Sequence, residues 1–78
     1  MDFCEEIMNI ARQNGICCEV WSEAKNVVAV EVIWGDWKHD HARLNWLVSK
    51  SLNVKKIGEK LTAEDGSDAY SSIHKFYF

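Results

Sequence analysis

The chain changes from a strand to a helix within residues 27–41, which read VVAVEVIWGDWKHDH. Apolar side chains occupy every second position from Val28 to Trp34, a pattern typical of a strand with one buried face. Gly35 then interrupts the alternation, and Asp36 is positioned to cap the helix that follows. This junction decides the fold, because it divides the chain into two halves of the same organisation.

The first half reads as a helix followed by a hairpin. Apolar residues recur at helical spacing over residues 3–13, where Asp2 is the expected N-cap and Gly15 part of the expected stop. Residues 16–21 then alternate as a strand, and the polar residues 22–26 predict a turn into the strand described above. A helix of this kind packs its apolar stripe against the neighbouring hairpin.

The second half repeats this order. It predicts a helix over residues 37–51, a strand over 54–61, an acidic turn over 62–68 and a final strand over 70–78. We expect an α+β two-layer sandwich of order αββαββ, in which a four-stranded, mainly antiparallel sheet carries both helices on one face. A mixed pairing at the centre of the sheet is the alternative. At 78 residues, the chain should form one domain over residues 1–78.

The composition is typical of a soluble globular domain, with 47% apolar and 27% charged residues. No apolar run is long enough to span a membrane and the first residues lack a basic signal region, so we expect a cytoplasmic protein. The net charge of −3 disfavours nucleic acid as a partner. Cys4, Cys17 and Cys18 lack the spacing of a redox or disulfide motif and are interpreted as structural thiols. No cofactor is expected.

One candidate site is a metal centre built from His39, His41, His74 and Asp36 or Asp40, since imidazole and carboxylate suit divalent transition metals. In an extended segment His39 and His41 would point to the same side. In a helix they lie roughly 200° apart and cannot hold one ion. A helix capped by Asp36 therefore excludes joint chelation, whereas a helix that starts after His41 would restore it.

A second candidate site is a recognition surface on the helix predicted at residues 37–51. At about 100° per residue, the apolar stripe of this helix turns Trp46 away from the core. Tryptophan and arginine are enriched in interface hot spots, so this side could bind a protein partner or a second copy of the chain. Alternatively, the helical phase differs by a residue or two, or the first helix covers Trp46. The stripe comprises Trp37, His41, Leu44, Leu47 and Val48, and the side turned away carries His39, Ala42, Arg43, Trp46 and Lys50.

The opposite face of the sheet is a related surface. With both helices on one side, the first hairpin would turn Trp21, Glu19, Glu31 and Ile33 toward solvent. We therefore expect Trp21 to contribute to dimerisation or to docking on a larger protein.

Two segments, IWGDWKHDH at residues 33–41 and EDGSDAYSSIH at residues 64–74, carry a resemblance. They look like small uncharacterised proteins carried on phages and conjugative elements of Gram-positive bacteria. The resemblance implies an accessory role in a mobile element and assigns no catalytic residue. It also pairs the histidine-bearing segments, which would fit His41 or His39 lying near His74.

These patterns predict a small non-enzymatic protein-interaction domain, with an accessory, adaptor or inhibitor-like role, that forms a homodimer or binds a larger protein. One alternative is a metal- or histidine-dependent enzyme that uses His39, His41 and His74. Another is a protein that binds single-stranded nucleic acid by stacking bases on Trp46.

Overall fold

The structure is a computed structural model and describes residues 2–33, 37–63 and 70–78. Its elements follow the predicted order αββαββ. Within the described residues, neither helix combines the length and apolarity needed to cross a bilayer. The helices are α1 (Phe3–Gln13) and α2 (Trp37–Ser51), and the strands are β1 (Cys18–Ala24), β2 (Val27–Val32), β3 (Lys56–Ala63) and β4 (Tyr70–Tyr77).

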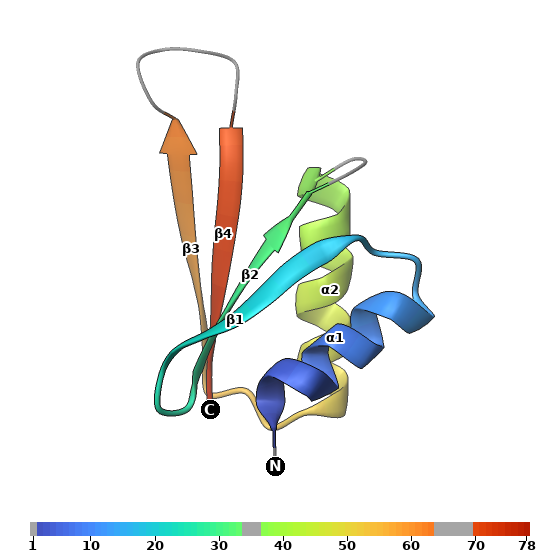
Figure 1. Cartoon of the computed structure of the whole chain (residues 1–78), viewed down its shortest axis with the longest axis vertical. Helices are drawn as coiled ribbons and strands as arrows, with labels where there is room; N and C mark the ends of the chain where they lie inside the picture. Colours follow the sequence, from blue (N-terminus) through green and yellow to red (C-terminus); the bar gives the residue numbers. More distant parts are fainter. Residues whose placement is uncertain (1, 34–36, 64–69) are drawn as a thin grey trace.

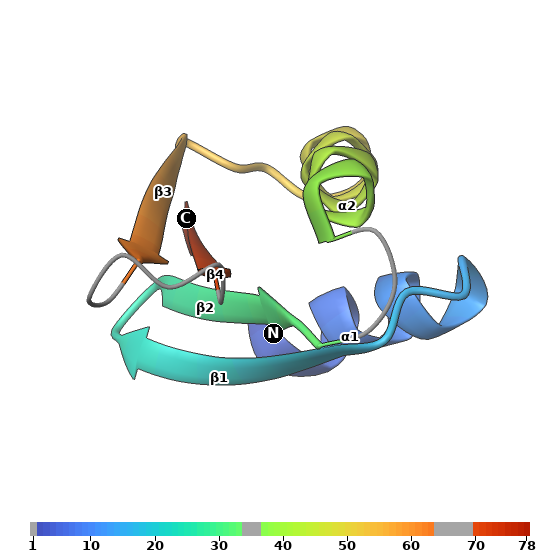
Figure 2. The same cartoon turned by 90° about the horizontal axis from the view of Figure 1, so that it is seen from above.

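The strands form one sheet in the order β1-β2-β4-β3, in which every neighbouring pair is antiparallel (Figure 1). Two hairpins are thus joined along β2 and β4, and the predicted α+β fold with an antiparallel sheet is confirmed. The mixed central pairing is wrong, because Val30 lies opposite His74 in an antiparallel register. The helices contact each other and lie beside the strongly twisted sheet (Figure 2).

Both ends of α1 are fixed by local hydrogen bonds. The Asp2 side chain accepts from the backbone N–H of Glu5 at 3.3 Å, as expected of an N-cap. Gly15 adopts a φ of 68°, and the N–H of Ile16 donates to the Ala11 carbonyl at 2.9 Å. A glycine in this left-handed conformation, followed by such a bond, is the Schellman stop of a helix.

The first hairpin is longer at its tip than the sequence predicted. β1 begins at Cys18 and continues through the polar residues to Ala24, with a register shift between Ser22 and Ala24. The turn is reduced to Lys25 and Asn26, and Asn26 takes the positive φ of 61° that closes it. The predicted turn at residues 22–26 was wrong in length, because a polar edge of a sheet carries no alternating hydrophobic signal.

The second half agrees more closely with prediction. α2 has the predicted bounds, β3 starts two residues later than expected, at Lys56, and β4 ends at Tyr77. The cap expected at Asp36 lies outside the described residues, as does most of the predicted acidic turn, residues 64–68.

The core lies between the helices and one face of the sheet. α1 packs on β1, whereas α2 packs on β2 and β4. At the end of the sheet, the rings of Phe3 and Phe78 stack with centroids 4.0 Å apart, which brings α1 against the residue after β4. The buried apolar cluster comprises Ile7, Ala11, Ile16, Val28, Val30, Val32, Leu44, Val48 and Phe76.

Candidate functional site

Three buried side chains set the rotation of α2 about its axis. Leu44 and Val48 are fully enclosed in the core, and His41 is 2% exposed on the same stripe. Leu47 lies half-buried at the edge of this stripe. The predicted inward face of α2 therefore agrees with the structure, apart from the Trp37 side chain, which lies outside the description.

This rotation turns Trp46 outward, where it is 62% exposed. His39, Ala42, Arg43 and Lys50 are exposed on the same side. We call these five residues the α2 outer face. Neither alternative to the predicted phase applies, because α1 does not cover Trp46 and the helical register is as expected.

The charged side chains of the α2 outer face have defined neighbours. An N–H of the Arg43 guanidinium donates to the Asn14 carbonyl at 3.3 Å, and a second nitrogen lies 3.9 Å from Asp40 Oδ1. The Lys50 Nζ lies 4.8 Å from the centroid of the Trp46 ring, within the range of a cation–π contact. The face thus presents one large aromatic ring between two cations.

The two neighbouring histidines of α2 lie in different environments. His39 is exposed, with its Nδ1 3.8 Å from Asp40 Oδ1. The His41 ring lies in the core, where its Nε2 accepts the backbone N–H of Val32 at 3.3 Å. A nitrogen that accepts carries no proton, so this bond requires His41 to be unprotonated at Nε2.

His41 also lies against the third histidine of the chain. Its ring stacks on the ring of His74 from β4, with centroids 3.8 Å apart and planes 10° from parallel. His74 is 4% exposed, and its Nδ1 lies 2.8 Å from Nδ2 and 3.1 Å from Oδ1 of Asn45. Asn45 therefore offers a donor and an acceptor to the same ring nitrogen and can serve either tautomer.

The geometry separates the residues of the expected metal centre. α2 begins at Trp37, so His39 and His41 project from different sides of a helix and cannot hold one ion. Asp36 lies outside the described residues. In the part of the chain that the structure describes, no three histidine, cysteine or acidic side chains are grouped so that they could hold a metal.

Trp21 has a structural partner on the open face of the sheet. Its indole N–H donates to Glu23 Oε1 at 3.0 Å, and the other carboxylate oxygen of Glu23 lies 3.9 Å from Lys75 Nζ. Trp21 is opposite the completely buried Ala29 in the sheet register and is itself half-buried. Its expected contribution to partner binding stays a prediction. Of the hairpin residues expected to face solvent with it, Ile33 is 47% exposed.

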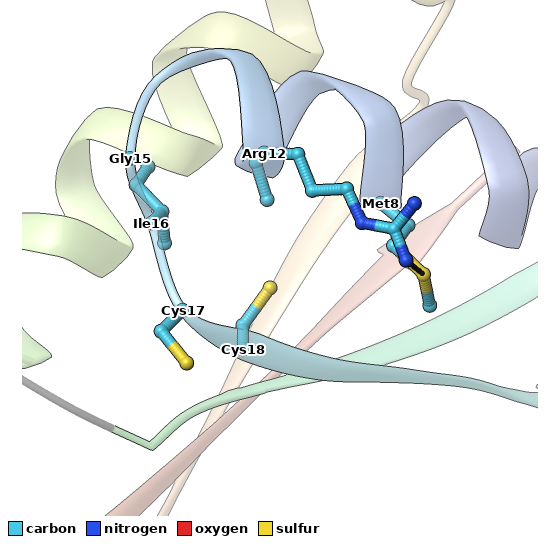
Figure 3. A pocket seen from close by; sticks show the side chains of 7 residues that line it. Met8, Arg12, Gly15, Ile16, Cys17 and Cys18 are labelled. Carbon is cyan, nitrogen blue, oxygen red and sulfur yellow. Dashed lines mark hydrogen bonds between the residues drawn. The ribbon is translucent and has the colours of Figure 1, made fainter.

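A hollow of about 330 Å³ lies where α1 passes into β1, lined in part by Met8, Arg12, Cys17 and Cys18. Figure 3 shows the two cysteine sulfurs pointing to opposite sides, as expected for neighbours on an extended chain. Burial, and secondly the charge of a Cys17 thiolate, raises the pKa of Cys18 to about 11. Such a thiol stays protonated near neutral pH, which fits a structural role.

Two contributors to the site were not identified from the sequence. Asn45 carries no motif and contacts His74 at a separation of 29 residues. The Val32 amide is a backbone group, so no residue type signals its bond to His41. The resemblance of the two histidine-bearing segments, and the candidate metal centre, both placed His74 near His41 or His39, and the structure places it against His41.

No family model matches the chain, and no significant match to it was found among curated proteins or solved structures. The relationship to proteins of mobile elements therefore stays a prediction.

Proposed function

We propose that the chain is a small non-enzymatic protein-interaction domain that binds its partner through the α2 outer face. The exposure of Trp46 carries this proposal. A tryptophan left 62% exposed on a well-packed helix forgoes the burial of a large apolar surface, and burying that surface is a main source of affinity in protein interfaces.

The surroundings of Trp46 support the same reading. Arg43 is held by the Asn14 carbonyl and Lys50 by the Trp46 ring, so neither cation has to be ordered entirely at the moment of binding. Ala42 leaves room beside the ring for a partner side chain. A partly preorganised tryptophan with an arginine beside it combines two of the residue types most enriched in interface hot spots.

The enzyme alternative has less support. His41 and His74 are 2% and 4% exposed, so a substrate atom could reach them only if α2 moved away from β4. General acid–base catalysis requires the ring nitrogen within hydrogen-bond reach of the reacting group. We interpret the histidine pair as a structural contact that holds α2 on the sheet.

Site-specific photo-crosslinking tests the proposal. A benzophenone amino acid replaces Ala42 at the centre of the α2 outer face, or Lys25 at the exposed β1–β2 turn as the matched control. In cells that express the full chain, we expect a discrete protein adduct from position 42 and none of that size from position 25. Equal adducts from both positions, or adducts that nuclease rather than protease removes, would contradict a protein partner at this face.

A further inference from the structure

The α2 outer face differs in charge from the rest of the molecule. The chain has 12 acidic and 9 basic residues, yet Asp40 is the only acidic residue of α2. The Asp40 side chain is 19% exposed and lies beside Arg43, at the boundary with α1 rather than beside Trp46. The face is therefore a basic patch on an acidic protein.

The two cations are spaced on either side of the aromatic ring. Arg43 and Lys50 are three residues before and four residues after Trp46, positions that adjoin it on a helix surface. Seven residues of helix separate the cations by about 10 Å along the axis. A complementary surface would place one carboxylate near each cation and an apolar side chain on Trp46 between them.

A second copy of the chain in a two-fold symmetric contact does not supply this complement. In a two-fold symmetric contact the same patch meets itself, so the cations Arg43 and Lys50 would face cations of the second copy, while Asp40 is already 3.9 Å from Arg43 of its own helix. Like charges brought together in an interface repel each other and suppress that pairing. A head-to-tail contact with an acidic region elsewhere on the chain would build a ring or an open filament rather than a two-fold dimer.

We infer that the partner of the α2 outer face is an acidic protein segment that carries an apolar side chain among its carboxylates. The inference rests on the proposed function. It follows from the Trp46 ring between two cations and from the position of Asp40, the one acidic residue of α2, beside Arg43 rather than beside that ring. Carboxylates of the segment pair with Arg43 and Lys50, while its apolar side chain packs on Trp46.

Three synthetic peptides test this chemistry on the full chain. The first is rich in glutamate with a central leucine, the second has glutamine at every glutamate position, and the third has lysine there. Binding is followed by the NMR signals of the Trp46 indole N–H, assigned with Trp46→Phe, and of the backbone amides of α2. Only the glutamate peptide should shift these signals, and the shift should weaken as ionic strength rises.

Reversing one charge at a time tests whether the glutamate peptide binds at the α2 outer face. Lys50→Glu should weaken binding of the glutamate peptide about tenfold and create affinity for the lysine peptide. Lys25→Glu changes the net charge equally at a distant turn and should leave the affinity for both peptides unchanged. Arg43→Glu is less diagnostic, because it also removes the bond to the Asn14 carbonyl.

Several outcomes would overturn the inference: equal binding of the glutamine and glutamate peptides, no binding of any peptide, or equal effects of Lys50→Glu and Lys25→Glu. Displacement of the glutamate peptide by oligothymidylate at equal charge concentration would instead favour single-stranded nucleic acid. Crosslinking at position 42 is independent of all these probes. A protein adduct there without glutamate-peptide binding would leave the proposed function standing and remove only the acidic partner.

Discussion

The ring of His41 lies flat on the ring of His74, with centroids 3.8 Å apart, and this contact joins α2 to the central strand β4. The same His41 ring accepts the Val32 amide from β2, so one side chain ties the helix to both central strands. His41 and Trp46 are five residues apart and project roughly 140° from each other on a helix. Burying the first therefore turns the second toward solvent.

His41→Ala should destabilise the fold by about 2–4 kcal/mol, because it opens a cavity in the core and removes the acceptor of the Val32 amide. The free energy of unfolding is measured by urea denaturation, with the slope m compared between variants. His39→Ala, on the exposed side of the same helix, is the control and should change stability by less than about 0.5 kcal/mol. Equal costs for the two variants would show that the stack does not hold α2 on the sheet.

The two neighbouring cysteines should differ in reactivity. Cys17 is exposed, whereas Cys18 is partly buried, and this burial raises the pKa of Cys18 to about 11 and so lowers its thiolate fraction near neutral pH. Iodoacetamide labelling followed by peptide mass spectrometry should therefore modify Cys17 first. Labelling of Cys18 at the same rate would contradict the burial of its thiol.

The raised pKa of Cys18 also predicts the direction of an alkaline effect. A thiol whose pKa rises from 9.0 to about 11 on folding favours the folded state below pH 9, and this contribution is lost as the pH climbs toward 11. Cys18→Ala should reduce the loss of stability across that interval, measured by chemical denaturation at each pH. An unchanged pH dependence of stability in Cys18→Ala would contradict a raised pKa of Cys18 in the folded protein.

Truncation of Trp21 should lower stability and leave binding unchanged, whereas truncation of Trp46 should do the opposite. Trp21→Ala removes a half-buried ring and its bond to Glu23, and should destabilise the fold by about 1–3 kcal/mol while leaving binding at the α2 outer face unchanged. Glu23→Gln retains an acceptor for the indole and should have the smaller effect. The result is checked by denaturation and by crosslinking from position 42. Unaltered stability in Trp21→Ala would show that Trp21 is free to serve a partner.

The spacing of apolar residues predicted α2 well, because the buried side chains of an amphipathic helix recur at every third or fourth residue. The start of α2 followed from the Gly35 break and the expected cap at Asp36, and the outward position of Trp46 followed from the apolar stripe within residues 37–51. The tip of β1 could not be predicted in this way, because its exposed residues Ser22–Ala24 show no alternation of apolar and polar side chains and are held by pairing with β2.

The histidine stack depends on contacts that are distant in sequence. The antiparallel register of β2 with β4 places His74 opposite Val30, and only this pairing brings the ring under α2. Periodicity within a segment carries no information about such a register. Asn45 was missed for the same reason, because its contact with His74 exists only after the hairpins have joined.

The most direct test of the account measures the position-42 crosslink in a Trp46→Ala background, together with the free energy of unfolding. Trp46 is mostly exposed, so its truncation should change stability by no more than about 0.5 kcal/mol while it abolishes the protein adduct. An adduct that persists undiminished in the folded Trp46→Ala protein would contradict the claim that the α2 outer face is the binding surface.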